Sequence, residues 1–461
     1  MKKPLTFLYK SRVVRFLQCI ALIFYLVLIW FSIGVVPPQG VNSKLFAQNN
    51  IATLIIWGVW LPFLLVSVAF LGRIWCALCP LELIGRIGSW LGYKFIKGKM
   101  VLPKIFNTGI AGVLIYAALL FMVLSWRFPT VPANVATLLV FLLICSFILS
   151  FLFGSRAFCN IFCPASILLR VSGRRGMLRI RQESAKICKD CKLKNCVALD
   201  ACPSKLNPKK LSDSSLCTLC GDCVESCAGI NIIPYIRKMP AVPFDSWRDY
   251  GWPVTVFAFF ITGYCVDEIF HNWEAAKSYY MFLPSFLKQF FDTKLIQGAI
   301  IGTWAMVVVP GVIWFSFILF KRLLKIGDNN KVFLHKLSLP VITILTAEQL
   351  TRAFTKFSHW IPSLNNAWRD FLSRINDNTL PQFELSITFP AFFKDVEKTN
   401  LFSSEVILIY SIVVVSIFSY FSLKEAKKLC VGRNAYMRIV AGFAFACGVL
   451  ILYPKLKAVF W

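Results

Sequence analysis

Charged residues are scarce in this sequence. They make up 16% of its 461 residues, whereas a soluble domain of ordinary composition carries about 25%. Hydrophobic residues make up 57%. This composition excludes an ordinary soluble domain and a charged disordered chain. It predicts a protein embedded in a lipid bilayer.

Histidine is scarcer still, with only three in the chain: His271, His335 and His359. A b-type haem between helices usually needs two facing histidines, and c-type haem attachment needs Cys-x-x-Cys-His, which is absent. The sequence also lacks a Walker motif, a dinucleotide glycine fingerprint and a flavin-attachment sequence of the Ser/Thr-Gly-Ala-Thr type. It therefore offers no motif for haem, flavin or nucleotide chemistry, and no sign of nucleic-acid binding.

Long apolar runs are abundant, and several reach the ~20 residues that a helix needs to cross a bilayer. The strongest runs cover roughly 13–36, 51–72, 106–125, 134–154, 252–270, 298–320, 404–423 and 439–454. A ninth run, about 335–353, is interrupted by Glu348 and Arg352, which lie one helical turn apart. These two side chains are expected to pair with each other, with a quinone or proton-path role as the alternative. The predicted fold is an all-α polytopic membrane protein with eight or nine transmembrane helices.

Acidic residues are few, 22 against 50 basic ones, for a net charge of +28. The basic residues collect in the N-terminus and in 73–104, 155–192, 321–336 and 424–438, while the loops 37–50 and 126–133 are almost neutral. Because Lys and Arg gather in cytoplasmic loops, this predicts a multi-pass protein of the bacterial cytoplasmic (inner) membrane with its N-terminus inside. Acidic redox partners or anionic lipid could use the remaining charge.

The first four runs form two repeated hairpins that end in similar sequences. The first ends Gly72-Arg73-Ile74-Trp75-Cys76-Ala77-Leu78-Cys79-Pro80, and the second ends Gly154-Ser155-Arg156-Ala157-Phe158-Cys159-Asn160-Ile161-Phe162-Cys163-Pro164. Proline favours the first helical turn, so Cys79 and Cys163 are expected beside helix N-termini. The positive helix end, with Arg73 and Arg156, is expected to favour the thiolate form.

Three interpretations of these membrane cysteines remain open. Cys76, Cys79, Cys159 and Cys163 could share one further metal ion or cluster between the two hairpins. Each pair could instead be a thiol/disulfide couple or a transient copper site, because soft thiolates select Cu(I). They could also be buried structural cysteines. The repetition favours the shared metal site.

The cysteine pattern between the two membrane regions is the most specific motif in the chain. Three cysteines at x2 spacing and a fourth at x3 wrap one [4Fe–4S] cluster and reach a second, an arrangement that zinc sites seldom use. By this exchange rule the first cluster is held by Cys188, Cys191, Cys196 and Cys227, and the second by Cys217, Cys220, Cys223 and Cys202. Most cysteines lie on the side predicted to be cytoplasmic, so metal ligation is favoured over disulfides.

These motifs divide the chain into four parts. Residues 1–170 form a membrane domain with the two hairpins, and 171–186 form a basic linker. Residues 187–235 form an inserted cytoplasmic two-cluster ferredoxin-like module, too poor in apolar runs to be ordered without inorganic cofactors. Residues 252–461 form a C-terminal membrane domain of four or five helices.

The Gly/Arg-aromatic-Cys…Cys-Pro ends and the following ferredoxin insert resemble the NapH/NosR/CcoG-type membrane-bound polyferredoxins over residues 13–235. The resemblance implies that the two membrane Cys pairs and the eight module cysteines are redox ligands. It also implies electron transfer between the quinone pool or cytoplasmic donors and reductases or metal centres, including copper reduction in some members. The first pair has two residues between its cysteines where the family usually has three.

The sequence thus predicts an iron–sulfur electron-transfer protein in the membrane, an oxidoreductase subunit or carrier with a partner protein or quinone. It would relay electrons between a cytoplasmic donor or quinol and a membrane or periplasmic acceptor. A cupric reductase or metal-centre assembly factor is the first alternative. A redox-sensing membrane regulator is the second.

Overall fold

The protein is mainly helical. The computed structural model describes residues 11–38, 43–96, 109–154, 156–197, 202, 204, 206–211, 215–227, 229–236, 251–376, 400–429 and 434–460. Among these residues, the helices long and apolar enough to cross a membrane are seven: Arg12–Trp30, Ile51–Leu71, Pro132–Phe153, Gly251–His271, Lys294–Leu323, Ser404–Lys428 and Asn434–Val459. Such runs become helices because lipid offers no hydrogen-bond partners to the backbone. The chain is therefore a multi-pass membrane protein.

The two other predicted spans are also helices but differ in kind. Helix α8 (Ile110–Trp126) is apolar but has only 17 residues. Helix α18 (Asn330–Trp360) has 31 residues and contains the interrupted ninth run, and it is less apolar than the other long helices.

The chain folds into two compact units, each assembled from three stretches of sequence. Unit 1 comprises Met1–Trp30, Phe63–Ile115 and Ala136–Pro243, and unit 2 comprises Phe31–Pro62, Tyr116–Val135 and Phe244–Trp461. The predicted continuous membrane domain over 1–170 therefore differs from the structure. Its segments 31–62 and 116–135 group with the C-terminal helices, while both Cys-Pro motifs share unit 1 with the 187–235 segment.

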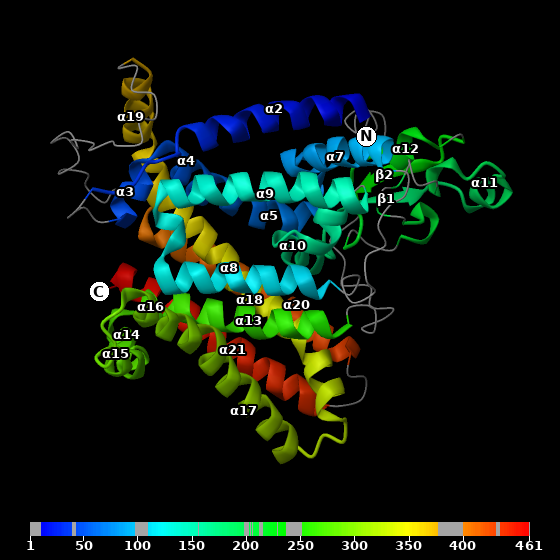
Figure 1. Ribbon diagram of the computed structural model, residues 1–461. Helices are drawn as coiled ribbons and strands as arrows, with labels where there is room; N and C mark the ends of the chain where they lie inside the picture. Colours follow the sequence, from blue (N-terminus) through cyan, green and yellow to red (C-terminus); the bar gives the residue numbers. More distant parts are fainter. Residues whose placement is uncertain are drawn as a thin grey trace. The chain divides into compact units, whose positions relative to one another are not determined.

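Unit 1 consists of a group of helices with a small mixed region at one end (Figure 1). The helices are α2 (Ser11–Trp30), most of α5 (Leu61–Leu71), α6 (Ile74–Leu78), α7 (Pro80–Phe95), most of α9 (Pro132–Phe153), the π-helical turn η4 (Phe158–Phe162) and α10 (Ala165–Gly173). The small region holds β1 (Leu178–Gln182), α11 (Ala185–Asp190), η5 (Asn195–Val197), η6 (Pro208–Lys210), α12 (Asp222–Glu225) and β2 (Ile232–Ile236).

Helices α7 and α9 pack closely because α7 presents glycines to its neighbour. A Cβ atom added to Gly88 would lie 2.6 Å from the carbonyl oxygen of Phe147, and one on Gly92 would overlap the carbonyl of Phe151. Gly85 faces the hydroxyl of Ser150 in the same way. Small residues at such spacing let two membrane helices approach until their backbones touch.

The segment 171–186 is not a linker in the structure. Strand β1 pairs with β2 in an antiparallel sheet, with Leu178 opposite Ile236 and Gln182 opposite Ile232. Arg174 and Arg175, expected in a solvated basic stretch, are both buried. The sheet closes the small region by bringing the sequences before Cys188 and after Cys227 together.

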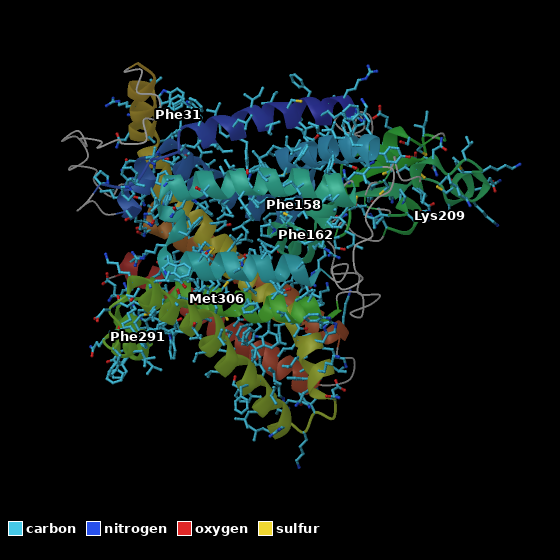
Figure 2. All side chains as sticks on the ribbon, in the orientation of Figure 1. Phe31, Phe158, Phe162, Lys209, Phe291 and Met306 are labelled. Carbon is cyan, nitrogen blue, oxygen red and sulfur yellow. The ribbon has the colours of Figure 1, made fainter. Side chains whose placement is uncertain are left out.

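Unit 2 is built around the buried helix α18. Helices α13 (Gly251–His271), α20 (Ser404–Leu429) and α21 (Asn434–Phe460) pack on it. The remaining elements are α3 (Ser43–Asn49), α4 (Ile51–Thr53), η1 (Leu54–Trp60), η3 (Phe128–Thr130), α14 (Glu274–Tyr280), α15 (Phe282–Lys288), α16 (Lys294–Thr303), η8 (Trp304–Val308), α17 (Val309–Leu323), η9 (Ile361–Ser363) and α19 (Leu364–Asn376). Met306 of η8 is buried, whereas Phe291 between α15 and α16 is exposed (Figure 2).

Candidate functional site

The two repeats of unit 1 end their long helices in the same way. Gly72 follows α5 with φ +86°, and Gly154 follows α9 with φ +94°, a left-handed conformation that glycine adopts without cost. The N–H of Gly72 donates to Val68 O (3.2 Å), and the N–H of Gly154 donates to Ser150 O (2.9 Å). Both helices therefore stop at a glycine cap just before the Cys-Pro motif.

The second cysteine of each pair also has the same backbone setting. Cys79 has φ −68° and ψ 127°, and Cys163 has φ −60° and ψ 120°. Their carbonyls accept from Glu82 N (3.1 Å) and Ser166 N (3.0 Å), respectively. Helix α7 begins at Pro80 and α10 begins at Ala165. The prediction that both cysteines lie at helix N-termini is therefore confirmed.

The one-residue difference between the pairs is absorbed by a π-helical turn. Cys76 lies in the α-helical turn α6, whereas Cys159 lies in η4, whose ends Phe158 and Phe162 are labelled in Figure 2. The N–H of Cys163 reaches back to Phe158 O (2.8 Å). An extra residue accommodated as a single π turn is common at functional sites. The shorter first pair therefore reaches the same geometry at its second cysteine.

The four membrane cysteines lie near one another, but the expected thiolate preference is wrong for the protein chain. Burial raises the pKa of Cys79, Cys159 and Cys163, the last to about 11, and neighbouring thiols of the set raise each further. Backbone N–H groups at the helix ends, and Arg73 in the case of Cys163, act in the opposite direction but do not compensate. The helix ends are too weak to offset the burial of Cys79, Cys159 and Cys163 and the effect of the neighbouring thiols. Binding a cation would deprotonate thiols of this kind outright.

Several module cysteines lie close to thiols that the spacing assigns to the same cluster. Burial raises the pKa of Cys196, and Cys227, Cys188 and Cys191 raise it further. Burial likewise raises the pKa of Cys217 to about 12, with additional contributions from Cys220 and Cys202. Burial raises the pKa of Cys223, and the thiols of its own set and Cys196 of the other set raise it further. Cys196, Cys217 and Cys223 thus each have thiols of their predicted set as electrostatic neighbours, and Cys196 also acts on Cys223 of the other set.

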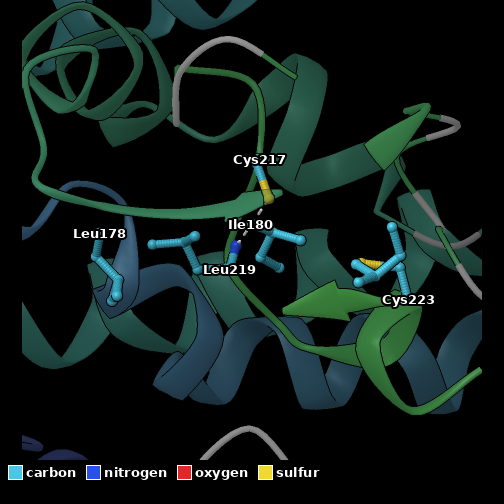
Figure 3. Close-up of a cluster of buried hydrophobic side chains, with 6 residues drawn as sticks. Leu178, Ile180, Cys217, Leu219 and Cys223 are labelled. Atoms are coloured by element: carbon cyan, nitrogen blue, oxygen red, sulfur yellow. Dashed lines mark hydrogen bonds between the residues drawn. The ribbon is translucent and has the colours of Figure 1, made fainter. Parts of the chain in front are cut away.

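Backbone and side-chain N–H groups point at the sulfurs. Leu206 N donates to Cys202 Sγ (3.3 Å), Leu219 N to Cys217 Sγ (3.4 Å) and Asn231 N to Cys227 Sγ (3.4 Å). Figure 3 shows the Leu219–Cys217 contact inside the apolar core that Cys217 and Cys223 share with Leu178, Leu219 and their neighbours. Hydrogen bonds to ligand sulfurs stabilise the extra negative charge of a reduced cluster.

The loop from Cys217 to Cys223 is shaped for an anion. Leu219 has φ +57°, uncommon for a residue with a branched side chain, and Gly221 has φ +83°. Alternating right- and left-handed backbone turns successive N–H groups inward, as occurs around iron–sulfur and phosphate sites. Leu219 holds this conformation because its side chain is fully buried in the module core.

The described cysteines do not lie in the geometry that a single metal ion requires. A zinc ion needs four sulfurs at about 2.3 Å from one centre. Within the residues that the structure describes, no three His, Cys, Asp or Glu side chains are close enough together to hold one metal ion. An iron–sulfur cubane is larger and holds its thiolates farther apart.

Asn231 joins the two halves of the first cysteine set, and the sequence motifs gave no sign of it. Its Nδ2 donates to Cys188 Sγ (3.1 Å) and to Ser184 O (2.7 Å), while its Oδ1 accepts from Ser184 N (2.8 Å). It is 2% exposed. Through these contacts it ties α11 to the turn after Cys227. An asparagine four residues after the last cysteine is the only signal that the sequence offers.

Buried charges connect the membrane motif to the module. Arg156 donates to Glu82 Oε1 (2.9 and 3.0 Å) and to Thr218 Oγ1 (2.8 Å), and its guanidinium faces the thiol of Cys220. Arg86 donates to Glu82 Oε1 and to Asp222 Oδ2, each at 2.6 Å. Burial tends to raise the pKa of Glu82, but Arg156 and Arg86 lower it overall. Glu82 is therefore ionised and held between two cations.

Arg73, the counterpart of Arg156 in the first repeat, also reaches the module. It is fully buried and donates to Ser215 O (3.1 Å), two residues before Cys217. The turn after α10 packs against the end of α5, just before Arg73. A Cβ on Gly176 would lie 2.5 Å from Gly72 Cα, and Met177 N donates to Phe70 O (2.8 Å). The equivalent arginines of both repeats thus hold the Cys217 loop.

No protein-family model, curated protein or solved structure matches this chain. Its function is therefore inferred from the chemistry of the site itself.

Proposed function

We propose that this chain is a membrane electron-transfer protein with two [4Fe–4S] clusters in residues 187–235 and a third redox site at the membrane Cys pairs. One observation carries the proposal. Thiols that motif spacing assigns to one site lie close enough within unit 1 to act on one another: Cys227, Cys188 and Cys191 act on Cys196, Cys220 and Cys202 act on Cys217, and Cys163 and Cys76 act on Cys79. Packing alone does not require three such sets.

The protein would hold the clusters with thiolates and tune them with its own dipoles. Cys188, Cys191, Cys196 and Cys227 would ligate one cluster, and Cys202, Cys217, Cys220 and Cys223 the other. When bound, each cluster supplies one-electron transfer. The N–H groups on the sulfurs would stabilise the reduced state, and the small apolar core would keep water away.

The buried ion pairs support a continuous route between the module and the membrane motif. Cys196 adjoins Cys223 of the second set, and Cys220 of that set faces Arg156. Arg156 binds Glu82, whose charge acts on the membrane residue Cys159. Three sites adjoining in this order suit a relay between a cytoplasmic donor or quinol and a membrane or periplasmic acceptor. The same features support kinship with the NapH/NosR/CcoG-type polyferredoxins.

A copper-handling role is the second candidate, and the membrane set favours it. The four membrane thiols, which are half-buried, would form a soft donor group, and soft thiolates select Cu(I). In that case the module would reduce Cu(II) by one electron, and the membrane thiolates would keep the product. A third iron–sulfur cluster and a copper ion therefore compete for the same four cysteines.

Electron transfer is tested by reducing anaerobically purified protein with dithionite and mixing it with a water-soluble quinone. The proposal expects cluster electron paramagnetic resonance signals in the reduced protein and rapid loss of those signals after mixing. Cys79→Ser with Cys163→Ser should slow reoxidation at least about tenfold, whereas Cys19→Ser, at a lone exposed thiol, should not. Reduction without any cluster signal would refute the proposal.

Metal analysis separates the two candidates. Iron and copper are counted before and after Cys76→Ser with Cys159→Ser. Loss of iron would assign a third cluster to the membrane set, and loss of copper would assign copper handling. Unchanged contents of both metals would show that these cysteines bind neither.

A further inference from the structure

Unit 2 contains ionisable side chains that the electron path does not use. They lie along helix α18, which spans about 46 Å at 1.5 Å per residue, and on the helices that pack against it. Residues 337–351 of α18 are all buried. Charged side chains at such a place are costly in a membrane, and by default they mark a functional site.

Glu348 stands out because its charge is not balanced by an ion pair. The sequence suggests that it pairs with Arg352, but Arg352 instead forms its ion pair with Glu268 Oε1 (2.7 Å) and donates to Tyr264 Oη (2.6 Å). Glu348 is 4% exposed, and its Oε2 has no hydrogen-bond partner among the described residues. An ionised carboxylate left half-satisfied in this position would cost several kcal/mol, so the carboxyl is suited to carry a proton.

The other groups that face Glu348 do not form an ion pair with its carboxyl. From α13 these are the Cys265 thiol, which hydrogen-bonds to its carboxyl, and Glu268. From α21 they are Cys447 and Lys455. Helix α8 contributes Tyr116, which neighbours Cys265. Helix α20 contributes Glu425, which accepts from Thr343 Oγ1 (2.7 Å), one to two turns before Glu348 on α18. Lys455 lies close enough to Glu348 for the two charges to interact, whereas Arg352 is already paired with Glu268.

Polar contacts lead from Glu348 toward the C-terminal end of α13. Gln349 Nε2 reaches Cys265 Sγ (3.9 Å) beside it, and Arg352, with Tyr264 and Glu268, follows within one turn. The last turn of α13 adds a buried Asp267, which accepts from Tyr280 Oη (2.9 Å) and lies 3.2 Å from His271 Nδ1. His271 is 29% exposed at its side chain. The chain of polar groups therefore reaches the protein surface.

In the opposite direction α18 is mostly apolar until its beginning. Leu339, Ile342 and Leu345 are buried, and the Thr346 hydroxyl donates to the carbonyl of Ile342 in its own helix. The next polar contact between α13 and α18 is that of Thr255 with His335 (3.0 Å), about 20 Å along the helix from Glu348. Access to the carboxyl is thus one-sided.

From this arrangement we propose that Glu348 is a proton-binding site inside unit 2, in exchange with water at the C-terminal ends of α13 and α18. The carboxyl binds a proton as a neutral acid in its apolar surroundings and releases it toward Arg352, Glu268 and the Asp267–His271 pair. This site uses no residue of unit 1, so it stands or fails independently of the electron-transfer proposal. It gives the C-terminal helices a proton-handling activity.

Dicyclohexylcarbodiimide tests the proposal, because it adds to protonated carboxyls in apolar surroundings and forms a stable N-acylurea. The full-length protein in liposomes is treated over a range of pH values, and adducts are mapped by peptide mass spectrometry. Glu348 should be labelled about tenfold more at mildly acidic than at alkaline pH. Glu405, an exposed carboxyl at the start of α20, is the matched control and should remain unlabelled.

Variants complete the test. Glu348→Asp should retain labelling, and Glu348→Gln should abolish it while the adduct pattern elsewhere is unchanged. Adduct mapping of the unaltered protein tests whether Glu348 binds a proton even if a variant does not fold. No adduct at Glu348 at any pH, an adduct independent of pH, or equal labelling of Glu405 would overturn the proposal.

Discussion

At the scale of single residues, the site depends on side chains that bridge distant parts of the chain. Arg156 lies 74 residues from Glu82 in sequence and 62 from Thr218, yet it binds both. A buried pair of this kind is costly to break, because removing one partner leaves the other charge uncompensated. Asn231 has a similar bridging role between Ser184 and Cys188.

Replacing Arg156 with methionine should loosen the module from the membrane motif. The Glu82 carboxylate would remain buried with one cation fewer, at a cost of about 3–5 kcal/mol. Limited proteolysis should therefore cleave residues 187–235 faster in the variant. Arg15→Met, at an exposed arginine of α2, is the control and should leave the cleavage rate unchanged. Equal cleavage in both variants would show that Arg156 does not hold the module.

Replacing Asn231 with alanine should lower the midpoint potential of one cluster. The variant loses the N–H on Cys188 Sγ, and a hydrogen bond worth about 1 kcal/mol corresponds to about 40 mV for a one-electron couple. A redox titration followed by electron paramagnetic resonance measures the shift. Asn207→Ala, which alters a partly exposed asparagine whose Oδ1 accepts from Lys209 N, should give no shift. A potential unchanged in both would remove Asn231 from the site.

At the scale of elements, the glycines of α7 set the distance to α9 and with it the place of Cys79, directly before α7. Their contacts are with the backbone carbonyls of Phe147 and Phe151, which cannot move aside as a side chain can. Helix α7 also carries Glu82. The position of α7 therefore determines both the place of Cys79 in the Cys-Pro motif and the ion pairs of Glu82.

Gly92→Ala should therefore lower the thermal unfolding midpoint of the detergent-solubilised protein by several degrees, since overpacking costs about 1–3 kcal/mol. Gly442→Ala is the matched control, because a Cβ there meets nothing within 4 Å. That substitution should be neutral or slightly stabilising, as alanine suits a helix better than glycine. A Gly92→Ala protein as stable as the control would contradict the close packing of α7 on α9.

The helices were predictable from the sequence, whereas the contacts between distant segments were not. Hydropathy marks helices such as α9, and the spacing of Cys217, Cys220 and Cys223 predicts ligands of one cluster, because both are local properties of the chain. The strand β1, placed in a linker by its basic residues, forms because β2 pairs with it 50 or more residues later. The pairing of Arg352 with Glu268 rather than Glu348 likewise depends on a contact between two helices.

At the scale of the whole molecule, the charge pattern predicts which ends of the helices face the cytoplasm. Residues 155–192 are rich in Lys and Arg and lead into the module, whereas residues 271–297, predicted to lie outside, are not rich in them. Alkaline phosphatase, active only outside the cytoplasm, should therefore be inactive when fused after Leu193 and active when fused after Asp292. The reverse result would place the cysteine sets on the outer side, where disulfides compete with metal ligation.

The central claim is that unit 1 holds iron–sulfur clusters, and the most direct measurement is the content of iron and acid-labile sulfide in anaerobically purified protein. The account predicts at least about eight irons and eight sulfides per chain, with more if the membrane cysteines hold a further cluster. Cys223→Ser should lower both contents together. Zinc in place of iron, or fewer than about eight irons in fully loaded protein, would contradict the account.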